Sequence, residues 1–205
     1  WGQNGSGQLG RGTISNSEEP GAVSLNEKAI AFGAGIGHTC ALVATGAVWC
    51  WGDNQQGQIG ATGTIVPGVP TEVKSLPPRT RALAVGDSHT CALTEAGGVR
   101  CWGHAAAGQL GDGTSRFSSS DPLAPQGLST GVTAIAAGTR HTCALLDGGA
   151  IRCWGENAHG TLGDDTAQNS NVPIVASAAP ANVAELSLGT ERTCARTSEG
   201  AVYCW

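Results

Sequence analysis

Short alternations of apolar and polar residues recur along the chain, each ended by a glycine turn. One kind is seen at 82–86 (Ala-Leu-Ala-Val-Gly) and 134–138; a second reads His-Thr-Cys-Ala-Leu, and a third reads Val-x-Cys-Trp. Such short runs between glycine or proline turns are typical of β-strands. The pattern therefore predicts an all-β protein.

The alternations belong to a unit that occurs four times. Tryptophan-glycine pairs start at Trp1, Trp51, Trp102 and Trp154, and a further tryptophan, Trp205, is the last residue. Successive tryptophans of this set are 50, 51, 52 and 51 residues apart. A period of this length, built of short strands and glycine turns, indicates a propeller or a solenoid. We place the repeats at approximately 1–50, 51–101, 102–153 and 154–205, and read Trp51, Trp102 and Trp154 as structural.

Each repeat has two cysteines ten residues apart, with a glycine six positions after the first. The pairs are Cys40 and Cys50, Cys91 and Cys101, Cys143 and Cys153, and Cys194 and Cys204; the glycines are Gly46, Gly97, Gly149 and Gly200. A three-residue hairpin loop that ends in such a glycine places the two cysteines opposite one another. Opposed β-carbons lie roughly 4.5–5.5 Å apart, close to what a disulfide needs. We predict four disulfides; free thiols and zinc are the alternatives, although this spacing matches no usual zinc pattern.

Disulfides favour a secreted, periplasmic or cell-surface protein, whereas free thiols would allow a cytoplasmic one. The net charge of −5 gives no basic footprint for nucleic acid, and no apolar run is long enough for a membrane span. Because the chain starts and stops inside a repeat, we expect a piece of a longer protein whose targeting segment lies upstream.

The fullest repeat, 38–60, reads His-Thr-Cys-Ala-Leu, a hairpin, then Val-Trp-Cys-Trp-Gly-Asp-Asn-Gln-Gln-Gly-Gln-Ile-Gly. It resembles the regulator of chromosome condensation repeat, and the resemblance covers the whole chain. It implies a β-propeller of four-stranded blades: a partial domain over 1–205, with about four of the blades of a seven-bladed ring and apolar faces exposed at both ends. Ala105, Thr161 and Arg192 depart from the motif and are interpreted as drift in single blades.

The family that the chain resembles includes nucleotide-exchange factors for a small GTPase, parts of ubiquitin ligases and a bacterial inhibitor of β-lactamases. The cysteine pairs favour the exported bacterial branch. We expect a protein-binding scaffold, an exported inhibitor or a surface interaction module, monomeric at full length, without catalysis, cofactor or metal. The alternative is an exchange factor for a small GTPase that acts through blades outside this chain.

His38, His89 and His141 recur at the same position of successive repeats. Catalysis needs one asymmetric cluster, so we expect buried histidines bonded to the backbone. Asp112-Gly113-Thr114 and Asp164-Asp165-Thr166 lack the alternating carboxylates of a calcium loop and are expected to be turns.

The position before each second cysteine holds a residue type that is common in binding hot spots. These candidate partner-binding residues are Trp49, Arg100, Arg152 and Tyr203; packing against the neighbouring blade is the alternative. The segments 11–28, 61–80, 112–131 and 164–182 vary most between repeats. We expect them to be connections that either determine partner specificity or serve as plain linkage.

Overall fold

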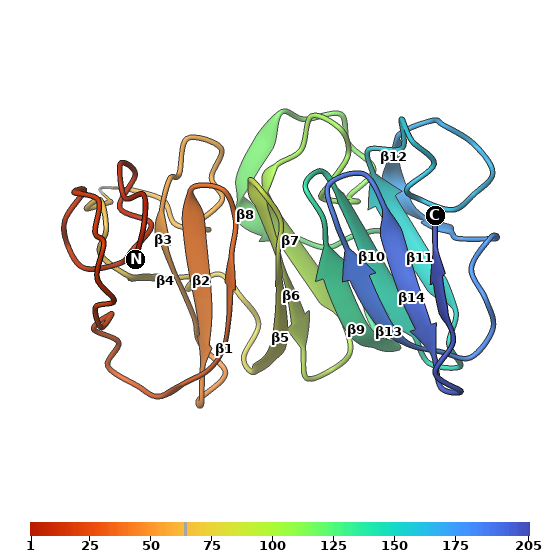
Figure 1. Cartoon of the computed structure of the whole chain (residues 1–205), viewed down its shortest axis with the longest axis horizontal. Coiled ribbons are helices and arrows are strands. Elements are labelled where there is room, and N and C mark those ends of the chain that lie inside the picture. The colour runs from red at the N-terminus through yellow and green to blue at the C-terminus, as the bar shows by residue number, and fades with distance from the viewer. Residues whose placement is uncertain (64) are drawn as a thin grey trace.

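The computed structural model describes residues 1–63 and 65–205, which form four antiparallel sheets that follow one another along the chain (Figure 1). Thr64, within the 61–80 connection, lies outside the described residues. The described residues form strands and turns without a helix, so the all-β prediction is confirmed. Each sheet is one blade of a propeller, and the blades follow the order of the repeats.

Three blades have four strands and the fourth has three. The first blade contains β1 (Ala29–Ala34), β2 (His38–Val43), β3 (Val48–Gly52) and β4 (Thr71–Glu72). The second contains β5 (Thr80–Val85), β6 (His89–Thr94), β7 (Val99–His104) and β8 (Ser118–Leu123). The third contains β9 (Val132–Ala137), β10 (His141–Leu146), β11 (Ile151–Gly155) and β12 (Ser170–Val175). The fourth contains β13 (Val183–Leu188), β14 (Thr193–Thr197) and β15 (Val202–Cys204).

The central hairpin of each blade has the register that the glycine spacing predicts. In the first blade the amide of Val43 donates to the carbonyl of Ala47 at 3.0 Å, and Gly46 has a φ of 86°. The three-residue loop sets Cys40 opposite Cys50 in the ladder. Disulfides join all four predicted pairs: Cys40–Cys50, Cys91–Cys101, Cys143–Cys153 and Cys194–Cys204.

The variable segments are more than connections, which corrects the expectation from sequence. Those at 61–80, 112–131 and 164–182 each contain the outermost strand of a blade, namely β4, β8 or β12. An edge strand needs hydrogen bonds on one side only, so it tolerates proline, and β8 and β12 contain Pro122 and Pro173. The irregular, proline-containing sequence hides these strands from pattern analysis.

Neighbouring blades share apolar cores. Leu83 on β5 packs into the cluster of the first blade, which includes Leu42 and Val48. Trp102 reaches the same cluster, and a side chain on Gly60 would meet its indole at 2.8 Å. Gly60 also has a φ of 67°, so glycine is required there for both space and conformation. The repeat tryptophan thus fastens its own blade to the preceding one.

The two outer faces of the four-blade unit expose the positions that the inner interfaces bury, as expected from the resemblance. Phe32, which matches Leu83 in register, is 80% exposed. Val202 matches Val48 and is 64% exposed, whereas Val48 is 1% exposed. The fourth blade is also more polar here, because Arg196 replaces the buried leucine and pairs with Glu185 at 2.8 Å.

Candidate functional site

A carbonyl oxygen at the end of each glycine-rich turn receives two hydrogen bonds from the next blade. The Gln58 carbonyl accepts the indole N–H of Trp102 at 2.9 Å and the hydroxyl of Thr90 at 3.1 Å. The carbonyls of Gln8, Gln109 and Thr161 accept the same pair of bonds from Thr39 and Trp51, Thr142 and Trp154, and Thr193 and Trp205. The backbone of each glycine-rich turn is therefore tied to side chains of the blade that follows it.

The repeated histidines extend this connection. The Nε2 atom of His89 lies 2.9 Å from the hydroxyl of Thr142, and that hydroxyl donates its own hydrogen to the carbonyl of Gln109. The threonine must then accept from the histidine, which assigns the ring hydrogen to Nε2. His38 and Thr90, and His141 and Thr193, repeat the arrangement. The three histidines are buried as expected, and the Nε2 partner of each ring is a threonine one repeat away. For His38, a backbone hydrogen bond with Asp87 opposes the lowering of the histidine pKa that burial causes.

Burial keeps these histidines uncharged. Removal from water lowers the pKa of His38 to about 4, against an opposing effect of the Asp53 carboxylate. The same cause lowers the pKa of His89 to about 3, with smaller contributions from neighbouring histidines, and the pKa of His141 to about 4. All three are neutral hydrogen donors at neutral pH, in positions that join blades.

The candidate partner-binding residues lie one to a blade, each on the third strand. Trp49, Arg100 and Arg152 are half-buried and Tyr203 is 49% exposed. Trp49 is paired across the sheet with Ala41 on one side and Glu72 on the other. Each residue belongs to a different sheet, and the role of the four in binding stays a prediction.

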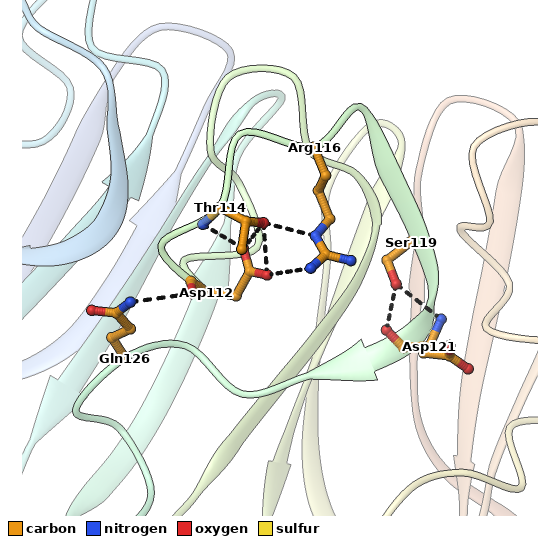
Figure 2. A network of polar contacts seen from close by, with 6 residues as sticks. All are labelled: Asp112, Thr114, Arg116, Ser119, Asp121 and Gln126. Carbon is orange, nitrogen blue, oxygen red and sulfur yellow. Dashed lines mark hydrogen bonds and ion pairs between the residues drawn. The ribbon is translucent and has the colours of Figure 1, made fainter.

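The Asp112 turn closes on itself. Its carboxylate accepts the backbone amide and the hydroxyl of Thr114, and it pairs with Arg116 at 3.0 Å (Figure 2). In the corresponding turn, Asp164 accepts from Thr166 in the same way. Among the residues that the structure describes, no group of three or more His, Cys, Asp or Glu side chains could hold a metal ion.

A hollow lies at the boundary between successive blades, and sequence reasoning did not single it out. A pocket of about 440 Å³ between the first and second blades, lined mainly by residues 54–57 and 118–121, has a larger counterpart one blade further on. This larger pocket, of about 540 Å³, lies between the second and third blades. It is lined by residues 105–108, 114–117 and 169–171. At its margin the ring of Phe117, 63% exposed, forms a T-shaped pair with the ring of His104, with the two centroids 5.2 Å apart. Ala105, interpreted from the sequence as drift, lines this pocket. It is the departure from the repeat motif by which the sequence could have indicated this blade.

Comparison with family models identifies the repeat. Two models, both described as "Regulator of chromosome condensation (RCC1) repeat", match the chain. One matches residues 1–42, 45–93 and 96–145, and the other matches 29–58, 81–109 and 132–161.

Curated relatives and solved structures agree with these matches. The chain is 32% identical to the ultraviolet-B receptor UVR8 of Arabidopsis thaliana, with 100% of the chain and 48% of the relative covered. It is 34% identical to the probable E3 ubiquitin-protein ligase HERC4 of Homo sapiens, with 85% of the chain and 17% of the relative covered. The chain thus spans half or less of these relatives.

Among solved structures, human WBSCR16 superposes with a TM-score of 0.87 at 25% identity, over 100% of this chain and 55% of that one. Prp20p of Saccharomyces cerevisiae superposes with a TM-score of 0.84 at 24% identity, over 100% and 52% of the two chains. In the part of the chain that the structure describes, no helix has the length and apolar character to cross a bilayer.

Proposed function

Because this chain belongs to the regulator of chromosome condensation (RCC1) repeat family, we propose that it is a non-catalytic, protein-binding propeller module. One observation carries the proposal. The polar side chains that recur in every repeat already bond between blades, while the exposed segments around the blades differ from repeat to repeat. Specific recognition of a protein needs about 800 Å² of such varied surface, whereas catalysis needs a converging cluster of reactive groups.

The variable segments supply a composite surface. The amide of Gly12 donates to the carbonyl of Gly68 at 2.8 Å, which brings the 11–28 and 61–80 segments together. Ile14, Val66 and Val69 project from these segments and are 58%, 56% and 40% exposed. Apolar side chains on a fixed backbone are suited to contact a partner protein.

We propose that the module works in an oxidising compartment, as an exported inhibitor or a surface interaction module. The support is that all eight cysteines form disulfides within blades, which is unusual in reducing compartments. The bacterial origin expected from the cysteine pairs stays a prediction, since the relatives described above are from a plant, human and yeast.

Regulation of a small GTPase is the alternative. Prp20p is described with binding properties toward Gsp1p and histones, but at 24% identity its likeness to this chain supports the fold alone. Repeats spaced 50 to 52 residues apart leave no room for an inserted hairpin, so exchange activity would depend on residues beyond these four repeats.

Affinity capture from the extracellular medium or cell envelope of the native source tests the proposal. The bait is the 205-residue chain, compared with the triple variant Ile14→Ser, Val66→Ser and Val69→Ser. Phe32→Ser is the matched control, because Phe32 is an even more exposed apolar residue, at 80%, but lies on an outer blade face. We expect a partner that is retained by the chain and the control and lost by the triple variant. Equal recovery with all three baits would refute this surface as the binding site.

A further inference from the structure

The second blade departs from the other repeats at residues that contact one another. In the third blade, the side-chain amide of Asn157 donates to the Asp164 carboxylate at 2.9 Å and to the Thr166 carbonyl at 3.1 Å. Asn4 likewise holds the segment that follows the first glycine-rich turn. The second blade has Ala105 at this position and lacks the amide that would hold its own connection.

Other contacts fix the connection of the second blade instead. The amide of Ala105 donates to the carbonyl of Phe117 at 2.8 Å, and the rings of Phe117 and His104 pack at 88° to one another. A hydrogen bond of 2.9 Å joins His104 Nδ1 to the amide of Gln109, which is itself 1% exposed. The exposed phenyl ring therefore packs on a half-buried histidine that is itself fixed by the buried Gln109.

The pocket beside these residues has a counterpart one blade earlier that is lined by Asn54, and alanine replaces that asparagine here. Ala105, Ala106 and Ala107 form an apolar wall of the pocket, and neutral polar side chains at 169–171 lie opposite. A pocket of about 540 Å³ falls in the usual range for recognition sites. Of the eleven described residues that line it, Arg116 alone has a charge.

The guanidinium of Arg116 is oriented in advance. Its Nε donates to the Thr114 hydroxyl at 2.8 Å and its Nη2 pairs with Asp112 at 3.0 Å, as Figure 2 shows. The side chain is 38% exposed, whereas that of Asp112 is 11% exposed, so the cation faces solvent and its counter-ion does not. A fixed arginine beside a fixed aromatic ring is the combination found at the centre of binding hot spots.

We propose that this pocket receives a loop of a protein partner that presents an apolar side chain next to a carboxylate. The apolar side chain would lie against Phe117 and the alanine wall, and the carboxylate would pair with Arg116. The inference rests on the proposed function as a protein-binding module. A neutral oligosaccharide is less suited, because it offers nothing to the single cation of the pocket.

A displayed library of random disulfide-closed peptide loops tests the proposal. The folded 205-residue chain is the target, and Kd values of selected loops are measured by calorimetry for Phe117→Ser and Arg116→Gln. Two matched controls are available: Phe32→Ser removes a phenyl ring that is 80% exposed, and Arg79→Gln removes an arginine from an exposed ion pair with Glu95. A thermal midpoint unchanged from that of the parent chain verifies that each variant is folded.

We expect selected loops to combine an apolar residue with an adjacent Asp or Glu, and each pocket variant to raise Kd by about tenfold or more. The two controls should leave Kd unchanged. Loops that bind equally well to the pocket variants would overturn this inference while leaving the proposed function intact. Failure to select any loop, or pocket-dependent binding of a glycan array in place of loops, would also overturn it.

Discussion

The Nε2 atom of His89 lies 2.9 Å from Oγ1 of Thr142, although 53 residues separate them in the chain. Both residues are buried, and each is in a different blade. The Thr142 hydroxyl donates its hydrogen to the carbonyl of Gln109, so three groups from two blades form one short chain of hydrogen bonds. The stability of the propeller is therefore linked to the protonation of a histidine at each inner blade interface.

Acid should destabilise the fold through His38, His89 and His141. Their pKa values are lowered from 6.5 to about 4, about 3 and about 4, so the unfolded chain binds protons more readily than the folded one. Stability is thus fully present above about pH 6.5 and is lost as the pH falls toward these values, by about 1.4 kcal/mol per histidine per pH unit.

The test of this acid effect is the free energy of unfolding measured by denaturant titration from neutral pH to pH 4. We expect a steep fall, and a smaller one in His89→Gln, whose side chain does not titrate. A free energy that stays constant over this range would contradict the prediction.

Thr142→Val should weaken the second interface strongly. The substitution preserves shape but leaves the buried Nε2 of His89 without a partner, which costs about 1–3 kcal/mol. Thr39→Val is the matched control, because Thr39 bonds to the Gln8 carbonyl and no bond joins it to a histidine in the described structure. Equal loss of thermal stability in the two variants would show that the histidine bond contributes nothing.

The four disulfides should differ in accessibility. Each closes a hairpin of cysteines ten residues apart and should stabilise the fold by roughly 2–3 kcal/mol. Cys40, Cys91 and Cys143 are 0% exposed, whereas Cys204 is exposed. We expect a mild reductant to open Cys194–Cys204 first in the 205-residue chain, with the products identified by thiol alkylation and peptide mapping. Prior alkylation of any other pair would count against this order.

Arg79→Gly should stabilise the protein. Arg79 has a φ of 63°, a conformation that costs an L-residue roughly 1–2 kcal/mol, and Gly131 occupies the equivalent position of the next blade with a φ of 77°. The ion pair with Glu95 at 3.4 Å is exposed and contributes little. We expect a gain of about 1 kcal/mol in the free energy of unfolding. Arg79→Ala, which loses the same ion pair but keeps the strain, should show no gain.

The features predictable from sequence are those that one repeat encodes locally. The loop that ends in Gly46 fixes the opposition of Cys40 and Cys50, so register and disulfides follow from spacing alone. The resemblance implied a fourth strand in each blade, but the residues of that outer strand were not located, because a strand such as β8 is defined by its pairing with β7 and not by an apolar alternation of its own. A strand at the edge of a blade tolerates polar residues and proline, so its sequence has no recognisable alternation of apolar and polar positions.

Contacts between repeats were also beyond sequence reasoning. The partner of His89 lies one repeat further on, and no spacing within the motif identifies Thr142 as the acceptor. The chemistry of the pocket beside Phe117 comes from several departures from the repeat that each look trivial alone, among them Ala105. Only the structure shows that Ala105 and Phe117 line the same pocket.

The position of each disulfide inside a single hairpin has a consequence for how such a gene can change. Duplication or deletion of one complete repeat adds or removes both partners of a bridge, so no unmatched thiol results. The bonds between blades follow the same rule, since each joins a repeat only to the one after it. Unequal recombination between repeats can therefore alter the number of blades in whole steps, and the encoded protein retains matched cysteines and matched interfaces throughout.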